Sequence, residues 1–400
     1  MSDQVTIPAA PPTEGLAWQV AVATLSRLFI NTARRFAYPF APALSRGLDV
    51  PVTAITWIIA ANQATGLLSP LFGPLGDRWG YRVMLLLGLS IVAVGLLSGG
   101  LIGVYGAVLV ALFLVGLGKA MFDPAIQAYV GERVSYRRRG LVIGMMEFSW
   151  AGSFLIGIPF VGLLIDRLGW RAPFFALGGL CLLGVAAIGL LIPSDRRRRH
   201  PAVLSPGFRE TWRLLSRDRG ALGALGFAFL LNVGNESLFV NYGVWLEDAF
   251  TLGVVAIGTA STTIGIAELV GEGFTAFVAD RVGLKRAVIV GLSLAMLSYF
   301  TLPFIGQTLP LALVGLFMLF LTFEFTVVTA YSLFTEVLPR ARGTMMAALT
   351  AVSGLGRVLG ALVGGAAWQT GGLMAVCLVA AVLSLMALAC FGWGLWHWRD

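Results

Sequence analysis

Charged side chains are scarce in this sequence. They make up 12% of its 400 residues, whereas hydrophobic side chains make up 58%. A soluble protein of this length needs more charge to cover its surface, so the composition indicates a surface that largely faces lipid. The three cysteines, Cys181, Cys377 and Cys390, form no CxxC pair, and both histidines, His200 and His397, lie outside the apolar runs. Neither a disulfide framework nor a zinc site is indicated, and a buried histidine proton relay is excluded.

Motifs of hydrolytic and ATP-driven proteins are also missing. The sequence contains no HExxH or GxSxG motif and no GxxxxGK[ST] loop. The last absence excludes a P-loop ATPase within this chain. We therefore expect no enzyme, no cofactor and no metal site.

What the chain has instead is apolar runs long enough to cross a bilayer. About 20 apolar residues span the hydrocarbon core as a helix, and backbone groups there must pair within the protein. The runs fall at 18–45, 51–75, 82–103, 105–130, 141–164, 172–193, 221–246, 255–279, 286–305, 309–335, 343–367 and 373–396. We expect an all-α membrane protein with twelve transmembrane helices in two six-helix bundles.

A polar segment, 194–220, divides the chain near its middle. It opens with four consecutive arginines at 196–199 and continues through Trp212, Leu214 and Leu215, a pattern that can form a short amphipathic helix on the membrane surface. The expected organisation is a tail at 1–17, a first half at 18–193, this linker at 194–220 and a second half at 221–400.

Lysine and arginine fall mostly on one side of the predicted bundle. If the N-terminus is cytoplasmic, the opposite loops hold Arg46, Arg167 and Arg171, and the other loop cations face the cytoplasm. This positive-inside pattern predicts cytoplasmic termini and a bacterial-type inner (plasma) membrane. It also explains the net charge of +8 through anionic headgroups, without nucleic acid.

Several landmarks recur 203 residues later in the chain: Asp77 as Asp280, Arg139-Gly140 as Arg342-Gly343, and Gly162 as Gly365. Three agreements at one offset indicate a duplication. A six-helix unit repeated in the same orientation is typical of one class of transporter.

The loop around Asp77 has a recognisable pattern. The run Gly73-Pro74-Leu75-Gly76-Asp77-Arg78-Trp79-Gly80-Tyr81-Arg82 resembles the hallmark Gly-x-Leu-x-Asp-Arg-x-Gly-x-Arg motif of the major facilitator superfamily. The second copy departs from it in having Ala276 at the first glycine. The run Arg34-Arg35-Phe36-Ala37-Tyr38-Pro39-Phe40 also looks like bacterial members of this superfamily.

The resemblance implies a secondary transporter whose two halves rock about a central site. It also implies a latch that holds the cytoplasmic side closed when the transporter faces outward. The residues expected in this conformational gate are Gly73, Asp77, Arg78, Gly80, Arg82, Arg139, Asp280, Arg281, Gly283 and Arg342. The alternative is a tightly packed turn whose charges only fix topology.

Ionisable residues inside the apolar runs are functional candidates because each is costly in lipid. Helical rise places them in three layers counted from the cytoplasmic end. The expected layers are Asp123, Glu147 and Glu272, carboxylates alone; then Lys119, Glu268 and Glu324; then Arg34, Arg35, Glu236 and Arg357. Tyr38 is expected near the third layer.

Spacing and depth suggest partners for these charges. Lys119 and Asp123 are four residues apart and can pair on one helix. Glu236 is expected to form a salt bridge across the halves with the Arg34–Arg35 region, and Glu324 to pair with Arg357.

Asp123 and Glu147 lie at similar depth on successive helices, and they are the best sequence candidates for carrying a coupling proton. The alternative for Glu147 is that it anchors an arginine of a cytoplasmic loop.

The sequence therefore predicts a secondary active transporter of a small organic solute, working by alternating access and coupled to H⁺. Export by antiport is favoured slightly over uptake by symport. The alternatives are a lipid or lysolipid flippase and a non-transporting sensor on the same fold. The expected partners are the solute and the lipid bilayer, and the protein is expected to be a monomer.

Overall fold

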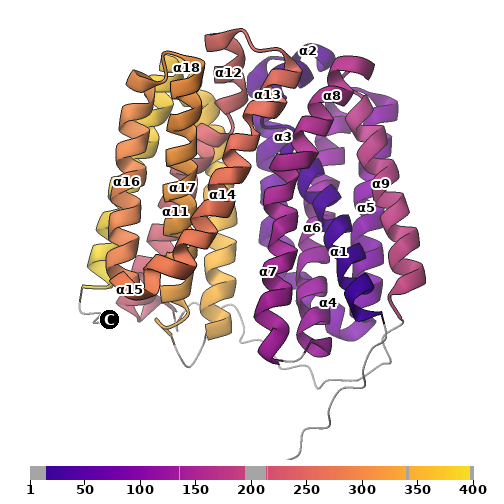
Figure 1. Cartoon of the computed structure of the whole chain (residues 1–400), viewed down its shortest axis with the longest axis horizontal. Coiled ribbons are helices and arrows are strands. Elements are labelled where there is room, and N and C mark those ends of the chain that lie inside the picture. Colours follow the sequence, from indigo (N-terminus) through magenta and orange to yellow (C-terminus); the bar gives the residue numbers. More distant parts are fainter. Residues whose placement is uncertain (1–14, 135, 194–212, 214, 339–341, 397–400) are drawn as a thin grey trace, which may run out of the picture.

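The computed structural model describes residues 15–134, 136–193, 213, 215–338 and 342–396, and among them helix is the only regular structure. This confirms the expected all-α fold. Two helical halves lie side by side in Figure 1. The first comprises α1 (Leu16–Arg35), α2 (Ala41–Leu48), α3 (Val52–Ala64), the 3₁₀ turn η1 (Thr65–Leu68), α4 (Ser69–Trp79), α5 (Tyr81–Ile102), α6 (Tyr105–Arg133), α7 (Tyr136–Gly152), the π-helical turn η2 (Ser153–Gly157), α8 (Ile158–Leu168) and α9 (Ala172–Leu191).

The second half has the same kind of organisation. It comprises α11 (Arg219–Phe239), α12 (Tyr242–Phe250), α13 (Val254–Ala260), α14 (Thr262–Phe274), the π-helical turn η3 (Thr275–Ala279), α15 (Asp280–Val282), α16 (Leu284–Ile305), α17 (Leu309–Phe334) and α18 (Arg342–Gly394). Most of the expected linker, including its amphipathic segment, lies outside the described residues.

The first apolar run is not one continuous helix. α1 ends at Arg35, a turn follows, and α2 begins at Ala41. Pro39 explains the break, because proline disfavours helical backbone in the residue before it and cannot donate its own N–H. The turn places Tyr38 at the centre of the molecule, where its side chain is buried.

The described residues contain nine helices long and apolar enough to cross a membrane, or ten if the bent pair of α2 with α3 and η1 counts as one span. The expected number of twelve therefore depends on two further features. One is α1, which carries Arg27, Arg34 and Arg35. The other is α18, whose backbone is not helical at Gly371 and Gly372, between the last two predicted spans.

The duplication is visible in the backbone. Gly80 (φ 92°, ψ 147°) and Gly283 (φ 90°, ψ 134°) lie at the 203-residue offset and adopt nearly the same positive-φ conformation, each directly before a long helix. Residues with a side chain rarely adopt this conformation, so glycine suits both turns.

Gly162 and Gly365, also at that offset, both face the opposite half. A Cβ on Gly162 would lie 3.1 Å from the carbonyl oxygen of Val254, and a Cβ on Gly365 would lie 2.9 Å from Oγ1 of Thr56. The absence of a side chain allows the helices to approach closely across the interface. α8 packs on α13 and α18 packs on α3 at these points.

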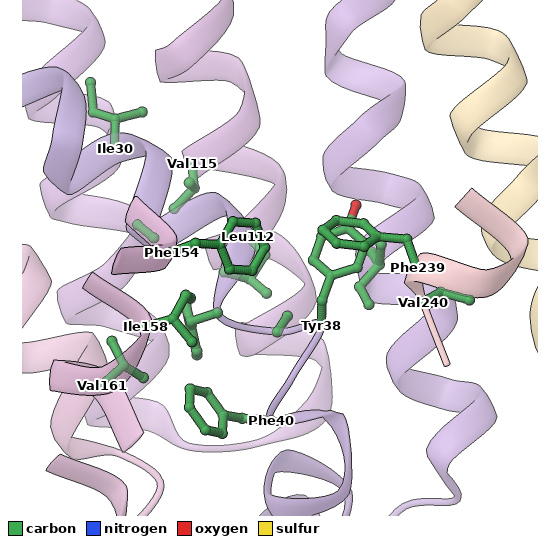
Figure 2. Packing of buried hydrophobic residues seen from close by; sticks show 14 of the residues in the cluster. Ile30, Tyr38, Phe40, Leu112, Val115, Phe154, Ile158, Val161, Phe239 and Val240 are labelled. Carbon is green, nitrogen blue, oxygen red and sulfur yellow. The ribbon is translucent and has the colours of Figure 1, made fainter. Parts of the chain in front are cut away.

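Aromatic and aliphatic side chains fill the interface between the halves (Figure 2). Tyr38 packs against Phe239 with ring centroids 4.4 Å apart, and Phe154 lies 5.9 Å from Phe239. All three side chains are buried. Since two of them come from the first half and one from the second, this packing holds the halves together around the polar groups described below.

The two ends of the bundle differ. We call the end that holds α2, α12 and α13 the α2 end, and the end that holds α4 and α15 the α4 end (top and bottom of Figure 1). At the α2 end the halves are joined by an ion pair between Arg46 and Glu247, at 2.5 Å, and by the packing of α8 on α13. Among the α4 side chains that the structure describes, which do not include Asp77, none forms a hydrogen bond or ion pair with the second half.

Candidate functional site

α1 presents a polar stripe to the interior of the bundle. Arg27, Asn31, Arg34 and Arg35 recur at spacings of four, seven and eight residues, which places them along one side of the helix. α1 packs against α6, α7, α9 and η2, so the stripe lies among other helices rather than in lipid.

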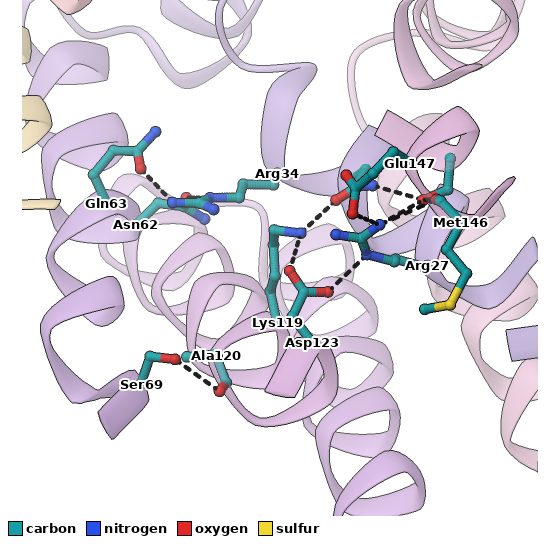
Figure 3. A network of polar contacts seen from close by, with 12 residues as sticks. Arg27, Arg34, Asn62, Gln63, Ser69, Lys119, Ala120, Asp123, Met146 and Glu147 are labelled. Atoms are coloured by element: carbon teal, nitrogen blue, oxygen red, sulfur yellow. Dashed lines mark hydrogen bonds and ion pairs between the residues drawn. The ribbon is translucent and has the colours of Figure 1, made fainter. Parts of the chain in front are cut away.

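The first part of the site is a four-charge cluster around Arg27 (Figure 3). Arg27 Nε donates to Asp123 Oδ1 at 3.0 Å, and its Nη1 donates to Glu147 Oε1 at 3.0 Å and to the carbonyl oxygen of Met146 at 3.1 Å. Lys119 Nζ donates to Asp123 Oδ2 at 2.6 Å, which confirms the predicted pair. Two cations and two carboxylates thus balance each other in a mostly buried setting.

This cluster corrects two expectations. The cytoplasmic layer was expected to hold carboxylates alone, but Arg27 lies there and binds two of the three. The arginine that Glu147 anchors therefore belongs to α1 and not to a loop. Sequence reasoning missed Arg27, although its seven-residue spacing from Arg34 places both on one helix face.

The second part is an ion pair between the halves. Arg35 of α1 and Glu268 of α14 form two parallel hydrogen bonds, Nη2 to Oε1 at 2.9 Å and Nη1 to Oε2 at 3.1 Å. Their side chains are 5% and 6% exposed. The guanidinium also lies over the ring of Trp150, 3.4 Å from its centroid, and donates to Ser153 Oγ at 3.3 Å. Such bidentate, stacked contacts are the strongest that arginine makes.

The third part is a hydrogen-bonded chain that also crosses the interface. Arg34 donates from Nε to Asn62 Oδ1 at 3.2 Å and from Nη2 to Gln63 Oε1. Gln63 donates to the Tyr38 hydroxyl, which donates to Glu236 Oε1 of α11 at 2.5 Å. The salt bridge expected for Glu236 is therefore wrong. Tyr38 binds Glu236, and the cross-half ion pair belongs to Arg35 and Glu268.

Three further candidates inside the helices of the second half, Arg357, Glu272 and Glu324, form no ion pair among the described residues, and in this they resemble Glu236. Arg357 donates from Nε to Asn232 Oδ1 at 3.1 Å, so its expected pairing with Glu324 is not found. Within the described part of the chain, neither Glu324 nor Glu272 has a hydrogen bond or an ion pair.

These two carboxylates lie together. α14 and α17 approach closely where a Cβ on Gly271 would lie 3.0 Å from Cβ of Glu324. Glu324 interacts electrostatically with Glu268, Glu272, Arg35 and Arg357. The candidate coupling residues of the second half thus surround the Arg35–Glu268 ion pair.

The expected gate is only partly visible. Gly80 and Gly283 form the two equivalent turns, Arg82 donates to the carbonyl oxygen of Gly189 in α9, and Arg342 binds Glu336 at 2.8 Å on the surface. Arg78 and Arg281 are exposed. The side chains of Asp77, Arg139 and Asp280, and the surroundings of Gly73, lie outside the described part of the structure, so the latch stays a prediction.

The charged site does not coincide with the apolar cavity of the second half. That cavity has a volume of about 380 Å³ and is lined by Val233, Val363, Leu378, Val379, Val382 and Leu383 of α11 and α18. Among the described residues, no group of three or more His, Cys, Asp or Glu side chains could hold a metal ion.

Comparisons with known proteins agree with this architecture. The family model of the Major Facilitator Superfamily matches the chain twice, at residues 23–246 and 225–399. Among curated protein sequences, the chain is similar to YceJ of Bacillus subtilis (strain 168), named an uncharacterized MFS-type transporter. The two are 26% identical over 345 residues, which cover 85% of this chain and 87% of YceJ.

Solved structures show the same fold. The nucleoside transporter NupG, in a mutant form, superposes with a TM-score of 0.76 at 14% identity over 95% of this chain and 100% of its own. A bacterial homologue of the human lysosomal transporter Spinster, in an inward-facing and unoccupied conformation, gives a TM-score of 0.74 at 18% identity over 95% and 94%. The chain belongs to the major facilitator superfamily of membrane transporters.

Proposed function

We propose that this transporter moves a small organic solute by alternating access and couples the movement to protons. The observation that carries the proposal is the set of charged side chains at the interface between the halves. Arg34 and Arg35 come from the first half, and Glu236, Glu268 and Arg357 come from the second. Ionisable residues at the interface of two six-helix repeats are where such transporters bind their cargo.

The contacts between the halves support a conformation open towards the α4 end. The halves meet at the α2 end through Arg46 and Glu247 and near the middle through Arg35 and Glu268. The positive loops lie at the α4 end, which we assign to the cytoplasm of a bacterial-type inner membrane. The structure then corresponds to an inward-facing state, and transport requires the contacts at the α2 end to break.

Glu272 and Glu324 are our candidates for carrying the proton. Asp123 and Glu147 each have a cationic partner, whereas Glu272 and Glu324 have none among the described residues. Both residues are only partly buried, and we propose that protons reach them through water between the halves. A proton on either changes the charge beside the Arg35–Glu268 pair and thereby biases the contact between the halves.

The test is solute flux in proteoliposomes under an imposed pH gradient, with a panel of cationic, anionic and zwitterionic compounds. We compare the wild type with Glu272→Gln, Glu324→Gln, Asp123→Asn and Glu147→Gln, and use the exposed Asp166→Asn as a matched control. Loss of gradient-driven flux with retained solute exchange in Glu272→Gln or Glu324→Gln supports the assignment.

Other outcomes decide against it. If gradient-driven flux were lost only in Asp123→Asn or Glu147→Gln, the coupling proton would belong to the Arg27 cluster and not to Glu272 or Glu324. If the flux of the wild type did not depend on the pH gradient, proton coupling would be overturned. The polarity of the gradient that drives accumulation separates export by antiport, which the sequence favours slightly, from uptake by symport.

A further inference from the structure

Arg34 and Arg357 differ from the other cations inside the helices. Arg27 and Lys119 bind Asp123, and Arg35 binds Glu268. Arg34 and Arg357 bind no carboxylate among the described residues, and their acceptors are the side-chain amides of Asn62, Gln63 and Asn232. An amide oxygen orients a guanidinium but does not neutralise it. Neither charge therefore has a hydrogen-bonded carboxylate at a depth where charge is costly.

The two arginines also act on each other. Hydrogen bonds bring both to α11: Arg357 donates to Asn232, and Arg34 is linked through Gln63 and Tyr38 to Glu236, one turn further along that helix. Their positive charges interact unfavourably with each other, and both interact favourably with Glu236. Arg34 belongs to α1 and Arg357 to α18, so the repulsion works between the halves. Asp123 also acts on Arg34, and Glu268 and Glu324 also act on Arg357, but none of these carboxylates is hydrogen-bonded to either arginine.

Donors remain free on both guanidinium groups. Within the described ranges, no hydrogen bond involves Nη1 of Arg34 or either Nη of Arg357, and none of these atoms is sealed from solvent. Free, accessible N–H groups on two arginines are the donors that bind a carboxylate in planar, two-pronged fashion.

From these contacts we infer that the transported solute is an organic monocarboxylate, whose carboxylate group is bound between Arg34 and Arg357. This inference rests on the proposed function and specifies its substrate class. A carboxylate supplies the anionic hydrogen-bond acceptor that the amides of Asn62, Gln63 and Asn232 do not provide. Because the arginines belong to different halves, the bound carboxylate replaces repulsion between the halves with attraction through a shared anion, and the loaded site favours closure.

Glu324 connects this site with the proton. The charged groups that act on Glu324 are Glu268, Glu272, Arg35 and Arg357. Glu324 forms no ion pair with Arg357 among the described residues, but its charge acts on that arginine. An ionised Glu324 therefore weakens the attraction of Arg357 for an anionic solute, and a protonated Glu324 does not, so protonation of Glu324 and binding of the carboxylate favour each other.

The inference is tested by binding, without transport, on the purified full-length protein in detergent. Isothermal titration calorimetry is run with benzoate as the monocarboxylate, succinate as a dicarboxylate, phenylalanine as the zwitterion and tetraphenylphosphonium as the cation. We expect benzoate to bind, and Arg34→Gln and Arg357→Gln each to weaken its binding at least about tenfold. The exposed Arg167→Gln should leave binding unchanged.

Folding failure is separated from loss of binding by Arg34→Lys and Arg357→Lys, which keep the charge and should bind benzoate with intermediate affinity. Stronger binding of phenylalanine than of benzoate, lost in Glu236→Gln, would replace the monocarboxylate with a zwitterion. Binding of tetraphenylphosphonium alone, or of none of the four probes, would overturn the inference. Benzoate binding without any flux in proteoliposomes would contradict the proposed function and leave the assigned site intact.

Discussion

Arg35 and Glu268 lie 233 residues apart in sequence and form a bidentate ion pair that joins the two halves of the molecule. The pair is almost fully buried, and Trp150 and Phe154 cover the guanidinium. In the proposed mechanism it is therefore a contact that must be broken or remade when the halves move.

Removing either partner of this pair should destabilise the protein strongly. Arg35→Gln or Glu268→Gln leaves one buried charge without its partner, at a cost of about 3–5 kcal/mol. The double variant leaves no lone charge and should lose clearly less than the sum of the two. Chemical denaturation in detergent micelles measures the three free energies of unfolding.

A surface pair provides the comparison. Arg46 and Glu247 also join the halves, but the Arg46 side chain is 60% exposed, so Arg46→Gln with Glu247→Gln should show a coupling of about 0–1 kcal/mol. Two results would contradict the role assigned to the buried contact. One is that the losses of unfolding free energy in Arg35→Gln and Glu268→Gln add up in the double variant. The other is that the coupling energy of this pair equals that of Arg46 and Glu247.

Tyr38→Phe should reduce transport while leaving the fold intact. The ring stays packed on Phe239, but the hydroxyl that links Gln63 with Glu236 is lost. A buried acceptor without its donor costs about 1–3 kcal/mol. Where this cost falls on the conformation that transports, initial flux falls about five- to 150-fold. Tyr242→Phe, which loses only a contact with Ser261, serves as the control. Equal flux in Tyr38→Phe and wild type would show that the chain across the interface is not part of the solute path.

Gly80→Ala and Gly283→Ala should have similar effects on stability. Both positions have φ near +90°, and alanine there adds strain of about 1–3 kcal/mol. Gly144→Ala, at a helical position with open space around the new Cβ, should be neutral or slightly stabilising. Unfolding midpoints in detergent measure the three. Clearly unequal losses at Gly80 and Gly283 would contradict the equivalence of the two turns.

Cross-linking the α2 end should arrest transport. Arg46→Cys with Glu247→Cys, placed in a chain whose own three cysteines are replaced by alanine, positions two thiols across the interface. A short bifunctional maleimide should then abolish flux, because the halves can no longer separate at that end. Each single cysteine treated with the same reagent should retain flux. Full activity of the cross-linked protein, verified by mass spectrometry, would rule out opening at the α2 end.

Local and repeated features were predictable from the sequence, and non-local partners were not. Lys119 and Asp123 pair as expected because both lie on one helix, four residues apart. The equivalent turns follow from the repeat around Gly80. The depth of a residue along its helix, in contrast, does not determine the direction in which its side chain points around the helix axis.

This is why the pairing of Glu324 with Arg357, expected within the second half, is not found. It also explains why the sequence did not predict that Arg35 pairs with Glu268 and not with Glu236. Two residues that share a depth can face different neighbours, and partners across the interface depend on how the halves pack.

Gly162 and Gly365 determine how closely the two halves approach each other. They are equivalent positions in the two repeats, and each touches the opposite half through a helix surface without a side chain. The contact of α8 with α13 lies at the α2 end, and in the proposed mechanism it separates when that end opens. Helix surfaces without side chains can part and meet again without interlocking groups. In that mechanism the two glycines ease the movement, although neither has a side chain that could bind solute or proton.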